Sequence, residues 1–390
     1  MKKKILFVCP TNRWEARERS LVHDIKIALA RGSEVVFYGL KDSPIDKHLY
    51  SDKIKKNYHP GLVQTHFFLW PKLTILSSLL EDTELALVHC YKLNILWPIC
   101  FFLRGNKEVS VIHSQYFELK KNYRVLWHRL LIRRCDMIFV PFEHLVKNSW
   151  SRLGMPARKI EVRPPLLIED EKFNEEAVIF DKFEQFYSIG IYVSDSDKSV
   201  HKFWSYIKAL EVSNEYFNWK KPIKLVFVTE GLWSEKSVYQ GLKQKVLETG
   251  VEEHVVFYSG GKPSNYIQHF DLWMSLLKGE GLDDFSLMAI SIGTPILVPR
   301  HPSTVEFFSV YGKVGETYKN NDVREIVRMW EKLLSDPDTY QDQIEMASGQ
   351  IRKEHSYENQ ENQYFRAYEK VVMRRERYRL RKAGSTAPKN

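Results

Sequence analysis

The sequence contains few cysteines and no familiar metal-binding motif. Its 390 residues include four cysteines, Cys9, Cys90, Cys100 and Cys135, at spacings that fit neither a zinc site nor a set of disulfides. Free thiols of this kind are typical of a cytosolic protein. No HExxH or P-loop element is present, so neither a metal nor another cofactor is expected.

Long hydrophobic runs are also missing. The most apolar segment, residues 95–103, contains Pro98, and it is shorter than the roughly 20 residues that a membrane-spanning helix needs. Three lysines after Met1 look like the start of a signal peptide, but the apolar stretch that follows, residues 5–10, is too short for a leader. We therefore predict a first strand at this position, and a cytoplasmic protein without a transmembrane segment.

Acidic residues are in deficit, so that the formal net charge is +9 and the pI is about 9.1. Most of the excess lies in the first half of the chain, where cations alternate with apolar residues in a basic amphipathic helix pattern. The cations are Lys120, Lys121, Arg124, Arg129, Arg133 and Arg134. Two interpretations stay open: an ordinary surface helix, or a peripheral contact with the anionic inner face of a membrane. No nucleic-acid-binding signature accompanies the charge, so nucleic acid is not expected as a partner.

Short strand patterns alternate with helical patterns along the chain. Six runs in the first half are rich in β-branched or aromatic residues: 5–9, 35–38, 85–89, 109–112, 137–140 and 160–162. A charged linker over residues 169–175 separates them from five more: 189–193, 224–228, 255–258, 272–276 and 295–298. This alternation predicts an α/β protein with two doubly wound, Rossmann-like domains, whose ligands bind beyond the carboxyl ends of the strands.

The predicted organisation has three parts. Residues 1–173 form the N-terminal domain, residues 174–356 form the C-terminal domain, and residues 357–390 form a closing helix with a basic tail. A helix that follows a finished sheet needs another surface on which to bury its apolar side chains. We therefore expect it to return to the first domain and to bury four residues there: Tyr364, Phe365, Tyr368 and Val371.

One segment of the second half carries a resemblance to a known family. Glu280 opens a loop with Gly281, a helical stretch follows, and this stretch ends at Gly293-Thr294-Pro295 before the next predicted strand. This order resembles the donor-site signature of the family 4 retaining glycosyltransferases. Weaker similarities occur in the same order elsewhere in the chain, for example over residues 136–143 and 153–160.

The resemblance implies the GT-B fold, in which two Rossmann-like domains face each other across a cleft. It implies that the C-terminal domain binds a nucleoside diphosphate sugar and that the N-terminal domain binds the acceptor. It assigns catalysis to Glu280 and His113. The residues that it assigns to donor binding are Lys198, Lys202, Gly281, Leu282, Met288 and Glu306.

Physical chemistry supports such a site independently of the resemblance. A loop that leads into a helix N-terminus presents open backbone N–H groups and the positive end of the helix dipole, which suit a diphosphate. The carboxylate of Glu280 can stabilise the positive charge that develops at the anomeric carbon. The alternative is that residues 293–295 form only a helix-to-strand turn and that Glu280 is a solvated loop residue.

The chain departs from the family pattern at three places. Met288 stands where the family has a second glutamate that binds ribose, and a thioether is a weak hydrogen-bond acceptor. No arginine follows the first strand of the second domain, which leaves Lys198 or Lys202 as the phosphate cation. Residues 11–15 replace the glycine-rich loop of the N-terminal domain.

Two histidines at predicted strand ends have alternative interpretations. His113 either contacts the donor sugar, helps to position the acceptor, or is a buried histidine with its hydrogen bonds satisfied. His89 precedes Cys90, but no third ligand or activating partner occurs at a recognisable spacing, so a metal or nucleophile site is not expected there.

Three hypotheses for function follow. The first is a glycosyltransferase of polysaccharide biosynthesis that moves a sugar, with retention, to a hydroxyl of a glycan or a lipid-linked glycan. The second is a catalytically silent GT-B subunit that binds a partner enzyme or a glycan, for which Met288 and the missing arginine are the reasons. The third is a nucleotide-sugar epimerase, which would need an acid/base pair that we cannot assign.

Overall fold

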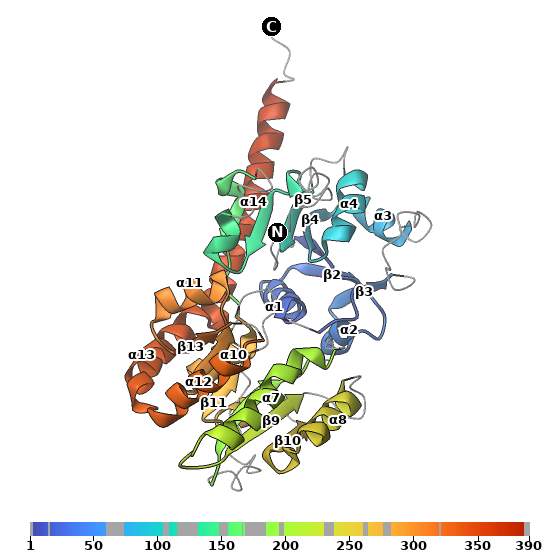
Figure 1. Cartoon of the computed structure of the whole chain (residues 1–390). Helices are drawn as coiled ribbons and strands as arrows, with labels where there is room; N and C mark the ends of the chain where they lie inside the picture. The colour runs from blue at the N-terminus through green and yellow to red at the C-terminus, as the bar shows by residue number, and fades with distance from the viewer. Residues whose placement is uncertain are drawn as a thin grey trace. The chain divides into compact units, whose positions relative to one another are not determined.

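The computed structural model describes residues 3–14, 16–59, 74–103, 109–114, 132–147, 155–165, 167, 185–194, 199–229, 238–259, 264–275, 282–319 and 321–385. The chain divides into two compact units, which are visible in Figure 1. One comprises Met1–Pro164 with Glu358–Asn390, and the other comprises Pro165–Tyr357. Among the described residues, no helix combines the length and the hydropathy that a membrane span requires.

The N-terminal unit is built on a parallel sheet with the strand order β3-β2-β1-β4-β5-β6-β7. Six of these strands overlap the runs predicted from the sequence. The exception is β3, an edge strand with two lysines and mostly half-exposed residues, so it lacks the apolar signal of a buried strand. The strands are β1 (Lys4–Val8), β2 (Glu34–Gly39), β3 (Ile54–Tyr58), β4 (Leu85–Cys90), β5 (Ser110–Ser114), β6 (Met137–Val140) and β7 (Ile160–Val162).

Helices connect these strands and cover the sheet. Residues 115–131 lie outside the described residues, so the basic amphipathic helix predicted over residues 120–134 stays a prediction; Arg133 and Arg134, at its end, are exposed residues of a turn. The described helices of this unit are α1 (Ala16–Ala30), α2 (Pro44–His48), α3 (Thr74–Leu80), α4 (Leu93–Phe102) and α14 (Tyr357–Ser385).

Helix α14, the last element of the chain, runs beside the N-terminal sheet (Figure 1). Tyr364 and Tyr368 are buried, and their hydroxyl oxygens lie 3.2 and 3.1 Å from Nδ1 of His89 in β4. Val371 is also buried, and Phe365 is half-buried. The apolar side chains of this C-terminal helix therefore pack within the N-terminal unit.

The C-terminal unit is built on a second parallel sheet, with the order β10-β9-β8-β11-β12-β13. Five of its strands overlap the predicted runs, and β13 was not predicted. This strand is short and polar, and it begins with Gly315, where a Cβ would lie 1.9 Å from the carbonyl oxygen of Ile296. The strands are β8 (Tyr187–Tyr192), β9 (Ile223–Thr229), β10 (Val255–Ser259), β11 (Leu272–Met274), β12 (Ile296–Pro299) and β13 (Gly315–Tyr318).

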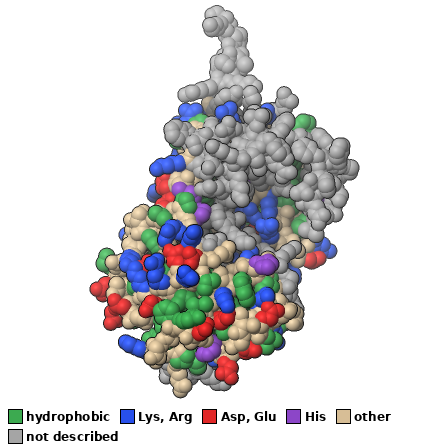
Figure 2. All heavy atoms as spheres, viewed as in Figure 1, with side chains coloured by type: hydrophobic (Ala, Val, Ile, Leu, Met, Phe, Trp, Pro, Cys, Tyr) green, Lys and Arg blue, Asp and Glu red, His purple; other side chains and the backbone are tan. Residues whose placement is uncertain are grey.

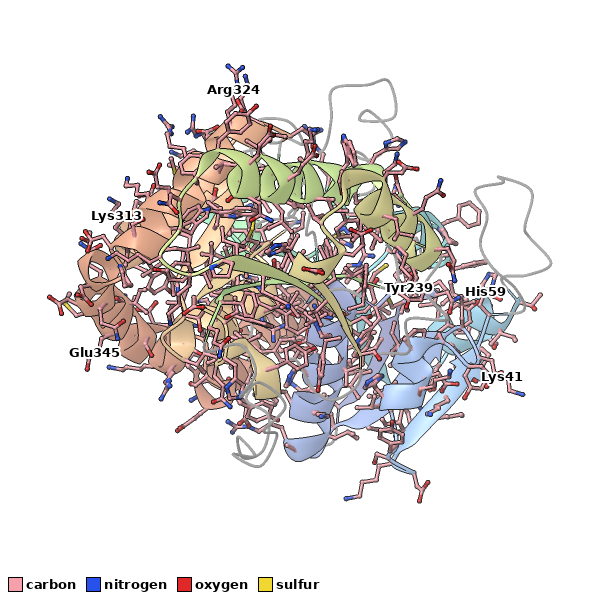
Figure 3. The ribbon with its side chains drawn as sticks, turned by 60° about the horizontal axis from the view of Figure 1, so that its bottom comes forward. Lys41, His59, Tyr239, Lys313, Arg324 and Glu345 are labelled. Atoms are coloured by element: carbon pink, nitrogen blue, oxygen red, sulfur yellow. The ribbon has the colours of Figure 1, made fainter. Side chains whose placement is uncertain are left out.

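In Figure 3, α7 lies across this sheet, while Lys313, Arg324 and Glu345 point outward from the unit. On the face shown in Figure 2, acidic and basic side chains are interspersed over the unit. Its helices are α7 (His201–Tyr216), α8 (Tyr239–Thr249), α9 (Ser264–Ile267), α10 (Asp284–Ser291), α11 (Pro302–Tyr311), α12 (Val323–Ser335) and α13 (Asp338–Glu354).

The division between the units comes earlier than the sequence predicted. We expected the boundary after residue 173, whereas the second unit begins at Pro165. The carbonyl oxygen of Pro165 accepts a hydrogen bond of 2.6 Å from Nδ1 of His355, and the amide of Leu167 donates to the carbonyl oxygen of His355 at 3.0 Å. These bonds tie the segment to the end of α13, although no periodic pattern in the sequence marks it.

Candidate functional site

The strand order of the C-terminal sheet reverses between β8 and β11. These strands pair in parallel with Gly190 opposite Trp273, and a Cβ on Gly190 would lie only 2.4 Å from the ring of Phe270. Ligands of doubly wound sheets bind outside the carboxyl ends of the strands at such a reversal. The residues that follow the strands at this edge are Val193 and Ser194 after β8, Ser275 after β11 and Arg300 after β12.

The predicted catalytic residue Glu280 and two of the predicted donor-binding residues, Lys198 and Gly281, lie outside the described residues. In the sequence, Lys198 falls between β8 and α7, and Glu280 and Gly281 fall between β11 and α10. Both segments therefore join elements that flank the reversal of strand order. Lys202 lies in the first turn of α7 and is half-buried.

The N-terminus of α10 is capped by a carboxylate of the chain itself. Oδ1 of Asp283 accepts a hydrogen bond of 2.7 Å from the amide of Ser286, and Oδ2 accepts one from the hydroxyl of Ser275. Burial raises the pKa of the Asp283 carboxyl, and the hydrogen bonds from Ser275 and Ser286 oppose this rise. Our expectation of open amides at this helix end is therefore wrong for the Ser286 amide. A diphosphate at this end would also meet the carboxylate of Asp283.

Helix α13 fixes the other end of α10. The carbonyl oxygen of Ser291 accepts hydrogen bonds from Nε of Arg352 at 2.8 Å and from the hydroxyl of Ser348 at 2.6 Å. A guanidinium at a helix C-terminus satisfies an open carbonyl and complements the helix dipole. Gly293 then turns the chain toward β12 with a φ of 98°, a conformation that favours glycine. The glycine of the Gly-Thr-Pro sequence is thus explained by the backbone conformation of the turn between α10 and β12.

Met288 belongs to the packed core of the C-terminal unit. All eight residues of α10 are buried, and the exposed fraction of Met288 is 2%. Leu282, just before the cap of the helix, is 3% exposed. Glu306, by contrast, lies on α11 and is half-buried.

Tyrosine and phenylalanine side chains hold the strand ends at this edge. The hydroxyl of Tyr318, in β13, donates to the carbonyl oxygen of Ser275 at 3.2 Å and is itself hydrogen-bonded to the hydroxyl of Tyr206 in α7. The rings of Tyr192, at the end of β8, and Phe285, in the first turn of α10, lie 4.2 Å apart between centroids. The end of β8, the end of β11 and the start of α10 are therefore packed as one body.

The two histidines of the N-terminal sheet are both buried. His113 is 1% exposed, and its Nδ1 lies 2.9 Å from the carbonyl oxygen of Cys90, so Nδ1 must be the donor in this bond. Nε2 of His89 lies 2.8 Å from the hydroxyl oxygen of Ser114, and its Nδ1 faces the hydroxyls of α14. His113 is thus buried with Nδ1 hydrogen-bonded, and its contact with the donor sugar or the acceptor stays a prediction.

Sequence analysis missed Asp283 and Ser275, which together close the start of α10. Asp283 is followed by a second acidic residue, Asp284, and then by a mainly apolar stretch, which is the signal of a helix N-cap with a carboxylate in the first turn. That signal could have identified the capped helix end. The contact with Ser275 could not have been found in this way, because it depends on the position of β11 beside the helix.

Among the described residues, no group of three or more His, Cys, Asp and Glu side chains is arranged to hold a metal. Two carboxylates at alternate positions, Asp195 and Asp197, follow Ser194 in the sequence and lie outside the described residues. The expectation that no metal is needed stays a prediction.

No protein-family model and no curated protein sequence matches the chain. Solved structures do match over almost its whole length. Anabaena HepE in complex with UDP and glucose is 14% identical, with a TM-score of 0.72 over 94% of this chain and 100% of that one. Sucrose-phosphate synthase from Thermosynechococcus elongatus is 13% identical, with a TM-score of 0.74 over 95% of this chain and 100% of that one.

A putative UDP-N-acetylglucosamine 2-epimerase from Listeria monocytogenes is also similar, at 13% identity and a TM-score of 0.61 over 92% of this chain and 98% of that one. Similarities at such low identity bear on the fold, because one fold hosts many activities. Together with the two parallel sheets and their strand orders, they show that the chain has the GT-B architecture.

Proposed function

We propose that the chain transfers a glycosyl unit from a nucleoside diphosphate sugar to a hydroxyl group of an acceptor. The observation that carries this proposal is the position of Glu280 in the sequence. It falls in the segment between β11 and α10, whose flanks Ser275 and Asp283 lie at the strand reversal of a GT-B fold. HepE, which has this fold, was solved with UDP-glucose, and this supports a nucleotide sugar as the donor.

Further assignments belong to the same proposal. Glu280 stabilises the charge at the anomeric carbon, and the backbone around Gly281 and Leu282 approaches the donor. Lys198 or Lys202 neutralises the diphosphate. We further propose that the sugar is transferred with retention of its anomeric configuration. The acceptor is a glycan or a lipid-linked glycan, and the basic N-terminal half makes a peripheral contact with the membrane.

Incubation of the full chain with a panel of nucleotide sugars tests the proposal. We expect slow hydrolysis of one donor in the absence of an acceptor, because water can replace the acceptor hydroxyl. Release of the nucleoside diphosphate measures it. If the chain bound and hydrolysed none of the nucleotide sugars in the panel, the proposal would be contradicted.

Replacement of Asp283 by asparagine is expected to tighten UDP binding about tenfold, because one negative charge near the diphosphate is removed. Asparagine is also a good N-cap, so the helix should be retained. Since ionised Asp283 repels the ligand, UDP affinity of the wild type should fall relative to that of the variant as pH rises through the raised pKa of this carboxyl. Titration calorimetry across pH measures both effects.

Asp322→Asn is the matched control for this change. Asp322 caps α12 in the same manner, with Oδ1 accepting from the amide of Glu325 at 3.1 Å, but α12 follows the edge strand β13. UDP affinity should be unaffected in the control. Equal affinities of wild type, Asp283→Asn and Asp322→Asn would show that the start of α10 is not close to the diphosphate.

Met288→Glu is expected to lower the melting temperature of the protein, because it places a carboxylate in a side-chain position that is 2% exposed. Thermal melts measure this. If the variant instead keeps its stability and binds UDP more tightly, by roughly 1 to 2 kcal/mol, then Met288 faces the ribose and a glutamate can still serve there. Met288→Leu is the control, since it keeps an apolar side chain of similar volume.

A silent GT-B subunit is the second candidate function. The carboxylate cap of Asp283 and the buried Met288 favour it, because both weaken a diphosphate nucleotide site at α10. Such a subunit would bind a partner enzyme or a glycan without turning over a donor. The donor panel separates the two candidates.

A further inference from the structure

Exposed arginines gather at the amino ends of the last two strands of the N-terminal sheet. Arg133 and Arg134 lie in the turn before β6, and Arg158 lies in the short helix η2 (Ala157–Lys159) before β7. All three residues are exposed. Ligands of a doubly wound sheet bind at the opposite edge, beyond the carboxyl ends of the strands. These arginines are therefore remote from the edge at which a substrate is expected.

Hydrogen bonds join these segments to one another and to α14. Nζ of Lys159 donates to the carbonyl oxygen of Arg133 at 3.4 Å and to that of Cys135 at 2.8 Å. Both Nη atoms of Arg374, an exposed residue of α14, donate to the carbonyl oxygen of Arg158, each at 3.4 Å. The arginines of three segments thus form one surface. We call it the basic edge, and it comprises Arg133, Arg134, Arg158, Arg374 and the exposed Arg377.

Carboxylates close to the basic edge are engaged with neighbouring groups. Oε2 of Glu161 lies 3.0 Å from Nζ of Lys370, and Oδ2 of Asp136 accepts a hydrogen bond of 2.9 Å from the amide of Val111. Farther along the same edge of the sheet, three carboxylates surround Nζ of Lys4 at the start of β1. The excess of cations is therefore found on the side of β6, β7 and α14.

The adjoining segments outside the described residues are also basic in sequence. Residues 104–108, 115–131 and 148–154 together contain seven Lys and Arg residues and two Glu residues. Two glutamates are too few to neutralise five exposed arginines. The positive charge of the basic edge therefore does not depend on where these segments lie.

Helix α14 carries further cations beyond the sheet. Its buried residues recur at helical spacing and include Tyr368 and Val371, whereas positions 375, 379 and 382, which continue this spacing, are Arg, Arg and Lys. Residues 374–382 contain six Lys and Arg residues and one Glu, and the helix continues to Ser385. In Figure 1, the last turns of α14 extend past the strands of the sheet. The apolar pattern with which α14 packs on the sheet thus ends where the basic pattern begins.

Two exposed apolar side chains accompany the arginines. Met373, next to Arg374, is 47% exposed, and Phe101, near the end of α4, is 44% exposed. Phe101 lies at the same edge of the sheet, because α4 leads from the carboxyl end of β4 to the amino end of β5. Cations together with apolar side chains suit the boundary between lipid headgroups and acyl chains. A soluble polyanion would leave the apolar side chains in water.

We propose that the basic edge and the last turns of α14 bind an anionic membrane surface. Each Lys or Arg close to such a surface strengthens binding about fivefold. This inference adds α14 and the arginines before β6 and β7 to the contact proposed for the basic N-terminal half. That the membrane presents a lipid-linked acceptor rests on the proposed glycosyl transfer. The surface itself rests on the exposed arginines and on the apolar side chains beside them.

Sedimentation of the full chain with vesicles tests the surface. The wild type should bind vesicles of phosphatidylcholine with phosphatidylglycerol, should bind phosphatidylcholine vesicles much less, and should lose binding as salt is added. The double variants Arg374→Gln/Arg377→Gln and Arg133→Gln/Arg134→Gln should each bind roughly 30-fold more weakly, because two cations are removed. All four arginines are exposed, so the variants should keep the melting temperature of the wild type.

Arg324→Gln/Arg328→Gln is the matched control. Both arginines are exposed residues of α12 in the C-terminal unit, and Arg324 points outward in Figure 3. The control has the same net charge as the other two variants and should bind vesicles like the wild type. Equal binding of the wild type and all three variants would overturn the proposal. Equal weakening in all three would also overturn it, because only the net charge would then matter.

A soluble polyanion is distinguished by a further variant. Met373→Gln should weaken binding to the anionic vesicles and leave the binding of a single-stranded oligonucleotide, measured by fluorescence anisotropy, unchanged. If the oligonucleotide bound more tightly than the vesicles and only its binding depended on the basic edge, the membrane would be the wrong partner. The donor panel contains no membrane, so a chain that binds vesicles but hydrolyses no donor would retain this surface and refute the proposed glycosyl transfer.

Discussion

Glu280→Gln is expected to reduce the turnover of glycosyl transfer by roughly 30- to 1,000-fold, which corresponds to about 2 to 4 kcal/mol of activation free energy. Glutamine has the shape of glutamate and keeps most of its hydrogen bonds, but it lacks the charge that stabilises the developing positive charge at the anomeric carbon. UDP affinity and the melting temperature should change little, because neither depends on that charge. Steady-state kinetics with the donor found in the panel measures the effect on kcat.

Glu345→Gln is the matched control for this variant. Glu345 is an exposed glutamate on α13 that points outward from the same unit (Figure 3). It should leave kcat unchanged. If Glu280→Gln transferred sugar at nearly the wild-type rate, Glu280 would be a solvated loop residue, and the proposed centre of the reaction would lie elsewhere.

Asp24→Asn is expected to destabilise the N-terminal unit by about 3 to 5 kcal/mol, because it leaves a buried guanidinium without its carboxylate. Oδ1 of Asp24 lies 2.5 Å from Nη2 of Arg163, and the hydroxyl of Tyr91 donates to Oδ2. Asp24 is fully buried and Arg163 is 9% exposed. Arg163 also lies over the ring of Tyr364, 4.5 Å from its centroid, so the loss would extend to α14. Urea unfolding followed by tryptophan fluorescence measures the change.

An exposed ion pair of the same unit provides the comparison. Nε of Arg31, the residue after α1, lies 2.6 Å from Oε1 of Glu361 in α14. Because the guanidinium is 43% exposed, Glu361→Gln should cost less than about 1 kcal/mol. The double change Asp24→Leu with Arg163→Leu should recover much of the stability lost in Asp24→Asn, since no unpaired charge then remains. If Asp24→Asn and Glu361→Gln lowered the free energy of unfolding by equal amounts, burial would add nothing to the stabilisation by the Asp24–Arg163 pair.

The two results bear on different parts of the proposal. A large loss of turnover in Glu280→Gln would require an active transferase and would exclude the silent subunit. The stability of the N-terminal unit concerns the position of α14, which presents Tyr364 and Tyr368 to His89.

The sequence predicted the architecture well because the apolar pattern of a strand lies within a few consecutive residues. Eleven of the strands were predicted from β-branched and aromatic runs, and nine of these are interior strands, which must be apolar because both of their faces are covered. The two strands that were missed, β3 and β13, are polar strands at the edges of their sheets. Edge strands can contain polar residues because they are less completely covered than interior strands. The boundary at Pro165 was misplaced because it depends on hydrogen bonds to His355, which is remote in sequence.

The candidate site was predictable only in outline. The spacing from Glu280 to Gly293 predicted a helix that ends in a turn, and α10 and Gly293 confirm both. The role of this segment in donor binding stays a prediction. Whether the helix end is open could not be read from that spacing, since it depends on the side chain of Asp283 and on Ser275 from a neighbouring strand.

By itself, the sequence determined two Rossmann-like domains, the position of most strands and the segment around Glu280, because periodicity and turn residues act over short distances. Only the tertiary structure decided the environments of the charged and polar side chains. The carboxylate of Asp283 at the start of α10 is one such case, and the buried Glu18 shared by Arg17 and Lys92 is another. Lys92 lies far from Arg17 in sequence, and their electrostatic interaction exists only because β1 and β4 are neighbours in the sheet.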